Sequence, residues 1–577
     1  MRFRDLAEAF GRLQLTRSRL RAVKIVADLF ERAPLEELGP IVYLLQGRVR
    51  PPYEGVELGV GERLLVRVIA RAAAATERSV LTRYRKSGDL GLVAEFLLGA
   101  PRGRPLSIKQ VHAGLLEVAR AGGAGAVERR IGLLVELLQR ASALEARYLV
   151  RVVQGRLRLG VGDATILEAA AEGGLGGRSR KALIEQAYNV RSDLGGVVRL
   201  AFARGTRGLT RVGPKVGVPV RPALAQRLSS AEAIVARLGA VRVEPKYDGF
   251  RLQLHRDGDR VWAFSRRLED VSAMFPDLTT ALRRQLRVRH AILDGEAVGF
   301  DSATGKFLPF QTTITRKRKH RISEAAARHP LRLYAFDLLF ANGRSYLGKP
   351  QRERSRRLAA LIRNPESGVV TPTESVRAGS TGELQRYFDL TVRRGLEGVV
   401  AKRPDAPYRA GARGYDWVKL KRSYQSKLRD TVDVVLIGYL AGRGKRAALG
   451  VGSLLGAVYD PRRDRYRTVA KIGSGLSERE WLALRRRMDR LATASPPRRV
   501  DSAITPDVWI EPRLVAEVLA DGITRSPIHT CGKSGRAPGY ALRFPRLLGI
   551  RADRTAEDAT TEREITQMYR MQGRAPA

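Results

Sequence analysis

The eight residues E-P-K-Y-D-G-F-R at positions 244–251 bring the chemical groups of a nucleophilic site into one short string. Lys246 carries a primary amine that attacks a phosphorus atom only when it is neutral, so we expect neighbouring cations to lower its pKa. Asp248 can hold a metal ion or orient the amine, Gly249 lets backbone approach a ligand closely, and Arg251 supplies positive charge. Taken alone, the string also fits an exposed charged turn after a strand.

Further candidate site residues follow Lys246 along the chain, most of them at the ends of expected strands. They are Arg266 in F-S-R-R, Glu296 in L-D-G-E, Phe336 and Asp337 in Y-A-F-D, Glu397 and Lys402 in E-G-V-V-A-K, and Lys419 and Lys421 in W-V-K-L-K. Lys419 and Lys421 are two positions apart and therefore point the same way on a strand. Each residue has an ordinary interpretation by itself, as a surface charge or as core. Their combination and order after Lys246 favour a shared site.

Residues 1–210 are typical of an all-α region that leads into an extended connector. Apolar residues recur at helical spacing in 20–33, 62–72 and 131–141, and stretches with Gly and Pro interrupt these helical patterns. The segment at about 210–228 is rich in Pro and Gly, so we expect extended chain there. Nothing in the first 210 residues resembles a catalytic site, and we expect packing and binding roles for them.

Two further regions carry strand patterns. Residues 211–427 mix strand and helix patterns and predict an α+β domain, with a buried strand at 290–300 and a hairpin turn at D-G-D, residues 257–259. Residues 428–577 carry short strands joined by turns, with one interrupting helix, and predict a small β-barrel. The chain of 577 residues is therefore expected to be multidomain.

Composition limits the partners and the compartment. Lys and Arg number 105 against 59 Asp and Glu, for a formal charge of +46. This excess favours nucleic acid as partner, although a genome-wide arginine bias would give the same composition. The one cysteine, Cys531, excludes a disulfide framework and a four-cysteine zinc site within the chain. We expect a cytoplasmic, nucleoid-associated protein, because the sequence shows no signal-peptide core and no apolar run of membrane-spanning length.

The K-x-D-G-x-R string at 246–251 and the motifs after it resemble the nucleotidyltransferase motif series of ATP-dependent DNA ligases of the archaeal and eukaryotic-like type. The resemblance covers essentially the whole chain. Q-G-R-L-R-L-G-V-G-D-A-T-I-L-E-A (154–169) resembles the end of their helical DNA-binding domain. V-R-P-A-L-A (220–225) resembles the entry into their catalytic domain, and R-F-P-R (543–546) resembles the final motif of their oligonucleotide-binding barrel.

The resemblance implies a helical DNA-binding domain at 1–210, an adenylation domain at 211–427 and an OB-fold domain at 428–577. Two departures from the family stand out. Arg554 occupies a position where the family usually has lysine, and the two cations differ in the way they hold phosphate. Pro245, directly before the lysine, removes a backbone donor and fixes φ there.

Carried over residue by residue, the resemblance implies that Lys246 forms a phosphoramide with AMP and that Glu244 binds the adenine amino group. Phe336 is expected to stack on adenine, with Arg251, Arg266 and Glu296 on the ribose and phosphate. The remaining implied roles are nucleotide contact for Arg413, α-phosphate binding for Lys419 and Lys421, Mg²⁺ coordination for Glu397 with Asp248 and Glu296, and pyrophosphate orientation for Arg543 and Arg546.

The implied reaction has three transfers, with ATP as AMP donor and Mg²⁺ as metal. Lys246 takes AMP from ATP, AMP passes to the 5′-phosphate of a nick, and the 3′-hydroxyl then displaces AMP and seals the strand. Nicked duplex DNA is the expected partner, bound through its phosphates without sequence preference by a protein expected to be a monomer. The sequence does not decide whether a sliding clamp or repair proteins are further partners, or whether the role is in replication, repair or recombination. It also leaves open whether ADP or GTP can replace ATP and whether Mn²⁺ can replace Mg²⁺.

Two alternatives remain beside this interpretation. The first is another lysine nucleotidyltransferase, an RNA ligase or capping-type enzyme, which would share the core motifs but not the helical N-terminal region. The second is a non-catalytic protein that binds duplex DNA, against which the intact Lys246, Glu296, Glu397 and Lys419 argue. An NAD⁺-dependent ligase is disfavoured, because that family carries a four-cysteine zinc site.

Overall fold

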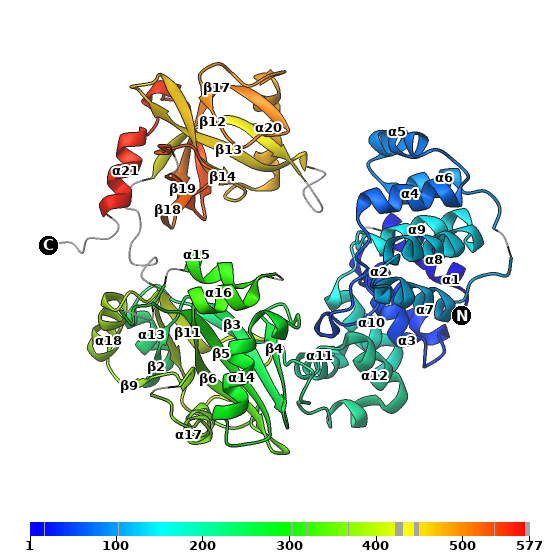
Figure 1. The fold of residues 1–577 in the computed structure, drawn as a ribbon, viewed down its shortest axis with the longest axis horizontal. Coiled ribbons are helices and arrows are strands. Elements are labelled where there is room, and N and C mark those ends of the chain that lie inside the picture. Colours follow the sequence, from blue (N-terminus) through cyan, green and yellow to red (C-terminus); the bar gives the residue numbers. More distant parts are fainter. Residues whose placement is uncertain are drawn as a thin grey trace. The chain divides into compact units, whose positions relative to one another are not determined.

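The computed structural model describes residues 1–571 except 17, 102, 158, 302–303, 309, 319, 367, 422–430, 443–448 and 536. The chain divides into two compact units, Met1–Lys419 and Leu420–Ala577. The first unit holds a helical region and a two-sheet region, and the second is rich in strands, so the expected fold class is confirmed (Figure 1). The boundary expected at 427/428 lies outside the described residues.

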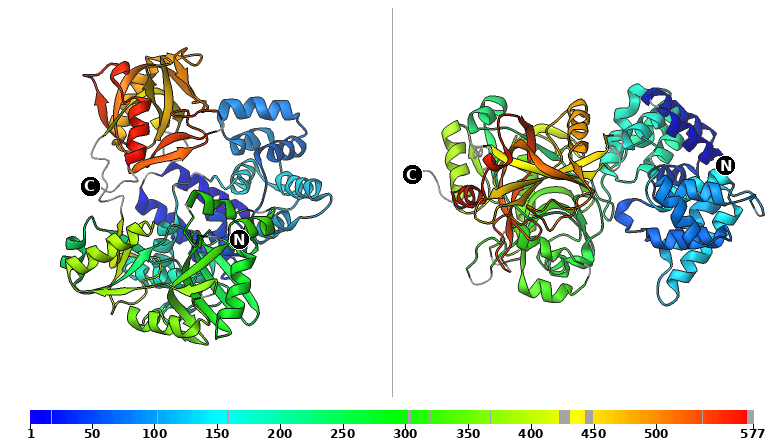
Figure 2. Two further views of the ribbon diagram at one scale, coloured as in Figure 1. Left: turned by 60° about the vertical axis from the view of Figure 1, so that its left-hand side comes forward. Right: turned by 90° about the horizontal axis from the view of Figure 1, so that it is seen from above.

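Helices alone make up the described secondary structure from α1 to α12, apart from two short 3-10 turns (Figure 2, blue to cyan). The helices are α1 (Phe3–Leu15), α2 (Arg19–Arg32), α3 (Leu38–Leu45), α4 (Glu62–Ala72), α5 (Glu77–Ser87), α6 (Leu90–Leu97), α7 (Ile108–Arg120), α8 (Ala126–Arg140), α9 (Ala143–Val153), α10 (Asp163–Leu175), α11 (Lys181–Val190) and α12 (Leu194–Leu209). Helices α2, α4 and α8 confirm the three predicted from periodicity.

Local sequence accounts for these helices. In α9, the Ser142 hydroxyl accepts the N–H of Glu145 while the Glu145 carboxylate accepts the N–H of Ser142, a capping box that fixes the first turn. Apolar faces then pack into one continuous core. Inside it, Arg151 and Asp89 form an almost fully buried ion pair at 2.7 Å, which joins α9 to the start of α6.

The two-sheet region begins with a five-stranded sheet in the order β1-β11-β10-β2-β9. Its strands are β1 (Leu224–Arg227), β2 (Val241–Lys246), β9 (Val376–Ala378), β10 (Gly398–Lys402) and β11 (Arg413–Lys421). Helix α18 (Thr381–Arg393) packs on β2, β9 and β10, and α13 (Ala231–Leu238) packs on α18. Strand β1 corrects one expectation, because part of the predicted extended connector pairs in parallel with β11.

The second sheet has the order β4-β3-β5-β6-β7, with β8 paired to β6. Its strands are β3 (Phe250–Asp257), β4 (Arg260–Ser265), β5 (His290–Gly299), β6 (Leu331–Ala341), β7 (Arg344–Ser345) and β8 (Val370–Pro372). Helices α14 (Pro276–Gln285) and α17 (Gln351–Leu361) pack on it, and α15 (Phe310–Thr313) and α16 (Ile322–Arg328) lie between β5 and β6 in the chain. The predicted hairpin is confirmed, since a two-residue turn with Gly258 at φ +61° joins β3 to β4.

The second unit contains one large sheet in the order β15-β17-β12-β13-β14-β16, with β20 paired to β17, and a separate β18–β19 ladder (Figure 1). Its elements are β12 (Val432–Ala441), β13 (Val451–Asp460), β14 (Arg465–Ile472), α20 (Glu478–Asp489), β15 (Ala492–Thr493), β16 (Val500–Asp501), β17 (Val508–Leu519), β18 (Gly522–Ser526), β19 (Gly539–Arg543), β20 (Arg546–Arg551) and α21 (Glu562–Met571). Register shifts in β12 and β13 supply the bends that a barrel needs.

No helix in the part of the chain that the structure describes combines the length and the apolar character needed to cross a bilayer.

Candidate active site

A cavity of about 570 Å³ lies where the two sheets of the first unit meet, a volume in the usual range for small-ligand pockets. Both sheets contribute to its wall, the first through β1, β2, β10 and β11 and the second through β3 to β6. Eight residues expected in the site line it: Glu244, Lys246, Arg251, Arg266, Glu296, Phe336, Arg413 and Lys419. The fold therefore gathers residues spread over about 175 positions of sequence into one wall.

Lys246 is the last residue of β2 and stands opposite Gly398 of β10. This register brings Glu397, the residue before Gly398, next to it. The Glu397 carboxylate lies 2.5 Å from the Lys246 ammonium, and the N–H of Glu397 donates to the Lys246 carbonyl oxygen. Asp248 follows two residues later, close enough for its charge to act on Lys246. The sequence string and the E-G-V-V-A-K motif thus meet through strand pairing.

The charge around Lys246 is the opposite of the expected one. Burial lowers the pKa of the Lys246 ammonium, but the carboxylates of Glu397, Glu296 and Asp248 outweigh burial and raise the pKa above its usual value. The expectation that neighbouring cations lower this pKa is therefore wrong. Without a further positive charge at these carboxylates, the amine is held as an ammonium and must lose its proton before it can attack.

Glu296 projects from β5 beside Arg251 of β3. Burial raises the pKa of its carboxyl to about 7, even though Lys246 and Arg251 act in the other direction. One of its oxygens accepts the Gly249 N–H at 3.2 Å. A Cβ at Gly249 would collide with the carbonyl oxygen of Ala297, so this close approach of the loop to β5 requires glycine.

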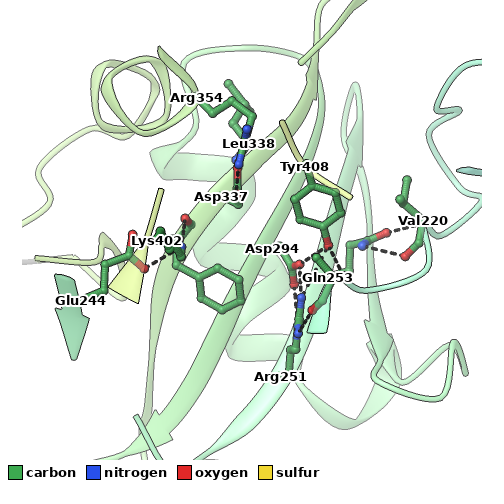
Figure 3. Close-up of polar contacts among 12 residues, drawn as sticks. Val220, Glu244, Arg251, Gln253, Asp294, Asp337, Leu338, Arg354, Lys402 and Tyr408 are labelled. Carbon is green, nitrogen blue, oxygen red and sulfur yellow. Dashed lines mark hydrogen bonds and ion pairs between the residues drawn. The ribbon is translucent and has the colours of Figure 1, made fainter. Parts of the chain in front are cut away.

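Arg251 lines the cavity, but its guanidinium forms hydrogen bonds to other groups of the protein (Figure 3). Its Nε and Nη2 donate to the two oxygens of Asp294, at 3.2 and 2.7 Å, and its Nη1 donates to the Ala223 carbonyl at 2.7 Å. The Tyr408 hydroxyl donates to the same Asp294 carboxylate at 2.7 Å. Asp294 and Tyr408 were not predicted. Asp294 lies within the quoted L-D-G-E string, whereas Tyr408 gives no signal in the sequence.

A buried ion pair lies in the same cavity wall. The Lys402 ammonium is 2.6 Å from the Glu244 carboxylate and donates to the Phe336 carbonyl oxygen at 3.0 Å (Figure 3). Burial raises the pKa of Glu244, and Lys402 opposes this shift. The ring of Phe336 meets the ring of Trp417 edge to face at 6.0 Å, so the polar pair adjoins an aromatic wall suited to a flat ligand.

Three of the expected cations line this cavity, and their side chains differ in solvent exposure. Arg266 and Arg413 are exposed, whereas Lys419 is half-buried. Lys421 shares the strand β11 with Lys419 but does not line the cavity and belongs to the second unit. Cations at the open part of a cavity and aromatic rings deeper in it suit a ligand with an anionic tail and a flat ring.

Among the described residues, no group of three or more His, Cys, Asp or Glu side chains is arranged as a metal-binding cluster. The carboxylates near Lys246 are nevertheless hard oxygen donors. Mg²⁺ is commonly held by one or two protein carboxylates together with substrate phosphates rather than by an all-protein cage. The residues present therefore fit Mg²⁺ in donor chemistry.

The arginines of R-F-P-R lie in the second unit, Arg543 at the end of β19 and Arg546 at the start of β20. Arg546 forms an ion pair with Asp521 at 3.0 Å, and Phe544 between them is exposed with φ at +50°. Arg554, the departure from the family pattern, pairs with Asp433 at 2.9 Å. The role of Arg543 and Arg546 toward pyrophosphate stays a prediction.

Three stretches of the chain match protein-family models: the DNA ligase N terminus over residues 2–171, the ATP dependent DNA ligase domain over 222–421, and the ATP dependent DNA ligase C terminal region over 447–554. A probable DNA ligase from Dictyoglomus turgidum is 43% identical over 99% of this chain and 98% of its own length. The DNA ligase of Pyrobaculum calidifontis is 42% identical and is covered from end to end, as is this chain. The solved structure titled Pmar-Lig_PreS3 shares the fold, with a TM-score of 0.56 at 17% identity over 94% of this chain and 99% of that one.

Proposed function

The chain belongs to the family of ATP-dependent DNA ligases, and we propose that it seals nicks in duplex DNA through a covalent AMP on Lys246. One observation carries the assignment of this residue: the Lys246 amine lies in the wall of a 570 Å³ cavity with Glu296, and Glu397 is paired to it. The amine displaces pyrophosphate from the α-phosphate of ATP. AMP then passes to the 5′-phosphate at the nick, and the 3′-hydroxyl displaces AMP to form the phosphodiester.

The residues of the cavity divide the work of the first step. Glu244 and Phe336 hold adenine, one by its amino group and one by its face. Arg266, Arg413 and Lys419 bind the phosphates, so that charge developing on the α-phosphate and on the leaving pyrophosphate is neutralised by groups already in place. Lys421 joins them from the same strand. Arg251 lies on the ribose side and acts chiefly by shaping the cavity wall, because its N–H groups already donate to the Asp294 carboxylate and the Ala223 carbonyl oxygen.

Mg²⁺ is the proposed metal, held by Glu397 and Glu296 with a contribution from Asp248 and completed by ATP phosphates. When bound, it supplies positive charge to the phosphates and to the carboxylates that now raise the Lys246 pKa. The Glu397 carboxylate, 2.5 Å from the ammonium, also accepts its proton.

The division of labour between the parts of the chain is likewise proposed. Residues 1–210 bind duplex phosphates, residues 211–427 carry out adenylation, and residues 428–577 bring Arg543 and Arg546 to the pyrophosphate. A nick has almost no sequence features, so the affinity comes from phosphate contacts with basic surface and is independent of sequence. The protein acts as a monomer in the cytoplasm, close to the nucleoid.

Incubation with α-³²P-labelled ATP and Mg²⁺, followed by denaturing electrophoresis, tests the first step. A labelled band at 63.8 kDa is expected. Addition of nicked DNA is expected to move the label to DNA and then release AMP as the nick is sealed. Nicked RNA and 5′-diphosphate RNA serve as comparison substrates. Absence of the band, or sealing confined to RNA, would contradict the proposal.

A further inference from the structure

The wall of the cavity holds a buried lysine, Lys402, for which the reaction outlined above provides no role. It is the last residue of β10 and is 1% exposed, yet it lines the cavity. Burying an ammonium is costly unless its donors are satisfied. A lysine in this position therefore requires an explanation beyond the general basic character of the chain.

Four contacts fix the Lys402 ammonium. It pairs with Glu244 at 2.6 Å, donates to the Phe336 carbonyl oxygen at 3.0 Å, and lies over two rings, 4.9 Å from the centre of Phe336 and 4.4 Å from that of Trp417. Figure 3 shows Lys402 between Glu244 and the aromatic ring beside it. One side chain thus fixes both groups that are proposed to hold the base, the carboxylate and the stacking ring.

The arrangement follows from strand pairing. Glu244 of β2 stands opposite Val400 of β10, which places Lys402 two residues along on the same face. Glu244 is also two residues before Lys246 on β2, so both residues face the same ligand. A base held at Glu244 and a phosphate held at Lys246 then belong to one nucleotide.

We propose that Lys402 is the positioning residue that sets the preference of this site for a 6-aminopurine, by holding the Glu244 carboxylate as a fixed acceptor for the amino group. The proposal rests on the proposed function. Adenine presents an N–H donor at position 6, whereas guanine and hypoxanthine present an oxygen acceptor there. An ionised carboxylate only accepts hydrogen bonds, so it binds the first and repels the second.

The other contact of Glu244 leaves capacity for this bond. Among the described residues, its second oxygen accepts a hydrogen bond from the Gln351 amide alone, at 3.4 Å, a long contact for a buried carboxylate oxygen. If Lys402 were absent, burial would favour the neutral form of Glu244, since its pKa is already raised. A neutral carboxyl can donate as well as accept, and the distinction between 6-amino and 6-oxo purines would then be lost.

A nearby ion pair shows what a purely structural pair looks like in this fold. Arg354 and Asp337 are joined at 2.6 Å and are buried as deeply as Lys402 and Glu244 (Figure 3). Arg354 also donates through Nη1 to the carbonyl oxygens of Lys349 and Ala406. Neither residue lines the cavity. The Lys402–Glu244 pair differs because both of its residues line the ligand-sized cavity. A pair that only stabilised the fold would not need to lie there.

The test compares three triphosphates that differ at position 6 of the purine: ATP, purine riboside triphosphate, which has no substituent there, and inosine triphosphate, which has an oxygen. Single-turnover rates of covalent lysine–nucleotide formation are measured for the full-length wild type, Lys402→Met and the control Lys306→Met. Lys306 is exposed in the same unit and does not line the cavity. The preference for ATP over the other two is expected to fall at least about tenfold in Lys402→Met and to stay unchanged in the control, as the strength of hydrogen bonds to charged groups implies.

A parallel fall of all three rates, with the ratios within about twofold of wild type, would show that Lys402 is only structural and would overturn the inference. If Lys402→Met does not fold, the double variant Glu244→Gln, Lys402→Met replaces both charges by neutral groups of similar size and leaves no buried charge unpaired. Wild-type preference in that variant would also overturn it. If the wild type forms no adduct with ATP, the proposed function fails; an adduct with unchanged ratios in the variant defeats only the role of Lys402.

Discussion

Replacement of Arg251 by methionine tests whether this residue holds the cavity wall together as well as facing the nucleotide. Methionine keeps much of the volume and removes the guanidinium. Among the described residues, the change leaves the Asp294 carboxylate, which is 1% exposed, with the Tyr408 hydroxyl as its side-chain partner at 2.7 Å, and it leaves the Ala223 carbonyl without its 2.7 Å donor. A buried carboxylate deprived of its counter-ion is the main source of the expected loss.

The magnitude follows from the contacts. Removal of one partner of a buried ion pair costs about 3–5 kcal/mol, and the surviving bond from Tyr408 places Arg251→Met at the lower end, about 3 kcal/mol. For a cooperative unit of ~150–250 residues, about 2–4 °C is lost per kcal/mol, so the transition of this region is expected to fall by about 6–12 °C. A transition that includes the helical region would be shifted less, because the unfolding entropy is larger.

Scanning calorimetry of the full-length protein measures this shift, with Arg357→Met as control, since Arg357 is exposed on α17. The double variant Arg251→Met, Asp294→Asn removes the orphaned charge and is expected to recover at least about 1 kcal/mol of the loss. A transition within about 2 °C of wild type in Arg251→Met, or strictly additive losses in the double variant, would refute the account of this pair.

Three further predictions concern other parts of the chain. Isolated residues 1–210 are expected to bind duplex DNA without sequence preference and to form no AMP adduct, with an affinity that falls steeply in a salt titration; a flat titration contradicts this. Arg543→Ala with Arg546→Ala is expected to slow enzyme adenylylation roughly 10²-fold in single-turnover assays while sealing of a 5′-adenylated nick changes much less, and equal losses in both steps would exclude the proposed role. Burial lowers the pKa of His255 to about 3, so the folded protein keeps it neutral while the unfolded chain takes up a proton below about pH 6.5. Stability is therefore lost as pH falls below 6.5, about 2 kcal/mol by pH 5 from this residue, and His255→Gln is expected to show a smaller acid loss in melting temperature than wild type.

Local signals in the sequence were enough for much of the fold. Apolar spacing gave α2, α4 and α8, and the D-G-D string gave the β3–β4 turn, because both depend on residues close in the chain. Strand β1 was missed because its partner β11 lies almost 190 residues later, and a Pro- and Gly-rich segment gives no sign of that pairing.

Eight residues expected in the site line one cavity, but the charges around Lys246 differ from the expectation. Motif order identified Lys246 and Glu397, but only the pairing of β2 with β10 shows that their charges meet and raise the pKa of the lysine. The link between Arg251 and Asp294 spans 43 positions, and the link between Lys402 and Glu244 spans 158, distances over which spacing in sequence carries no information. The proposed role of Arg543 stays a prediction, because Arg543 belongs to a different compact unit from Lys246 and local sequence carries no information on how two units meet.

The central claim is that Lys246 carries AMP between ATP and DNA, and Lys246→Ala tests it most directly. Wild type and variant are incubated with α-³²P-labelled ATP and Mg²⁺, separated by denaturing electrophoresis, and compared in binding to nicked duplex DNA by gel shift. The account predicts loss of the labelled band and of nick sealing by the variant, with DNA affinity largely retained because phosphate contacts spread over the chain supply it. A labelled band of normal yield from Lys246→Ala would contradict the account.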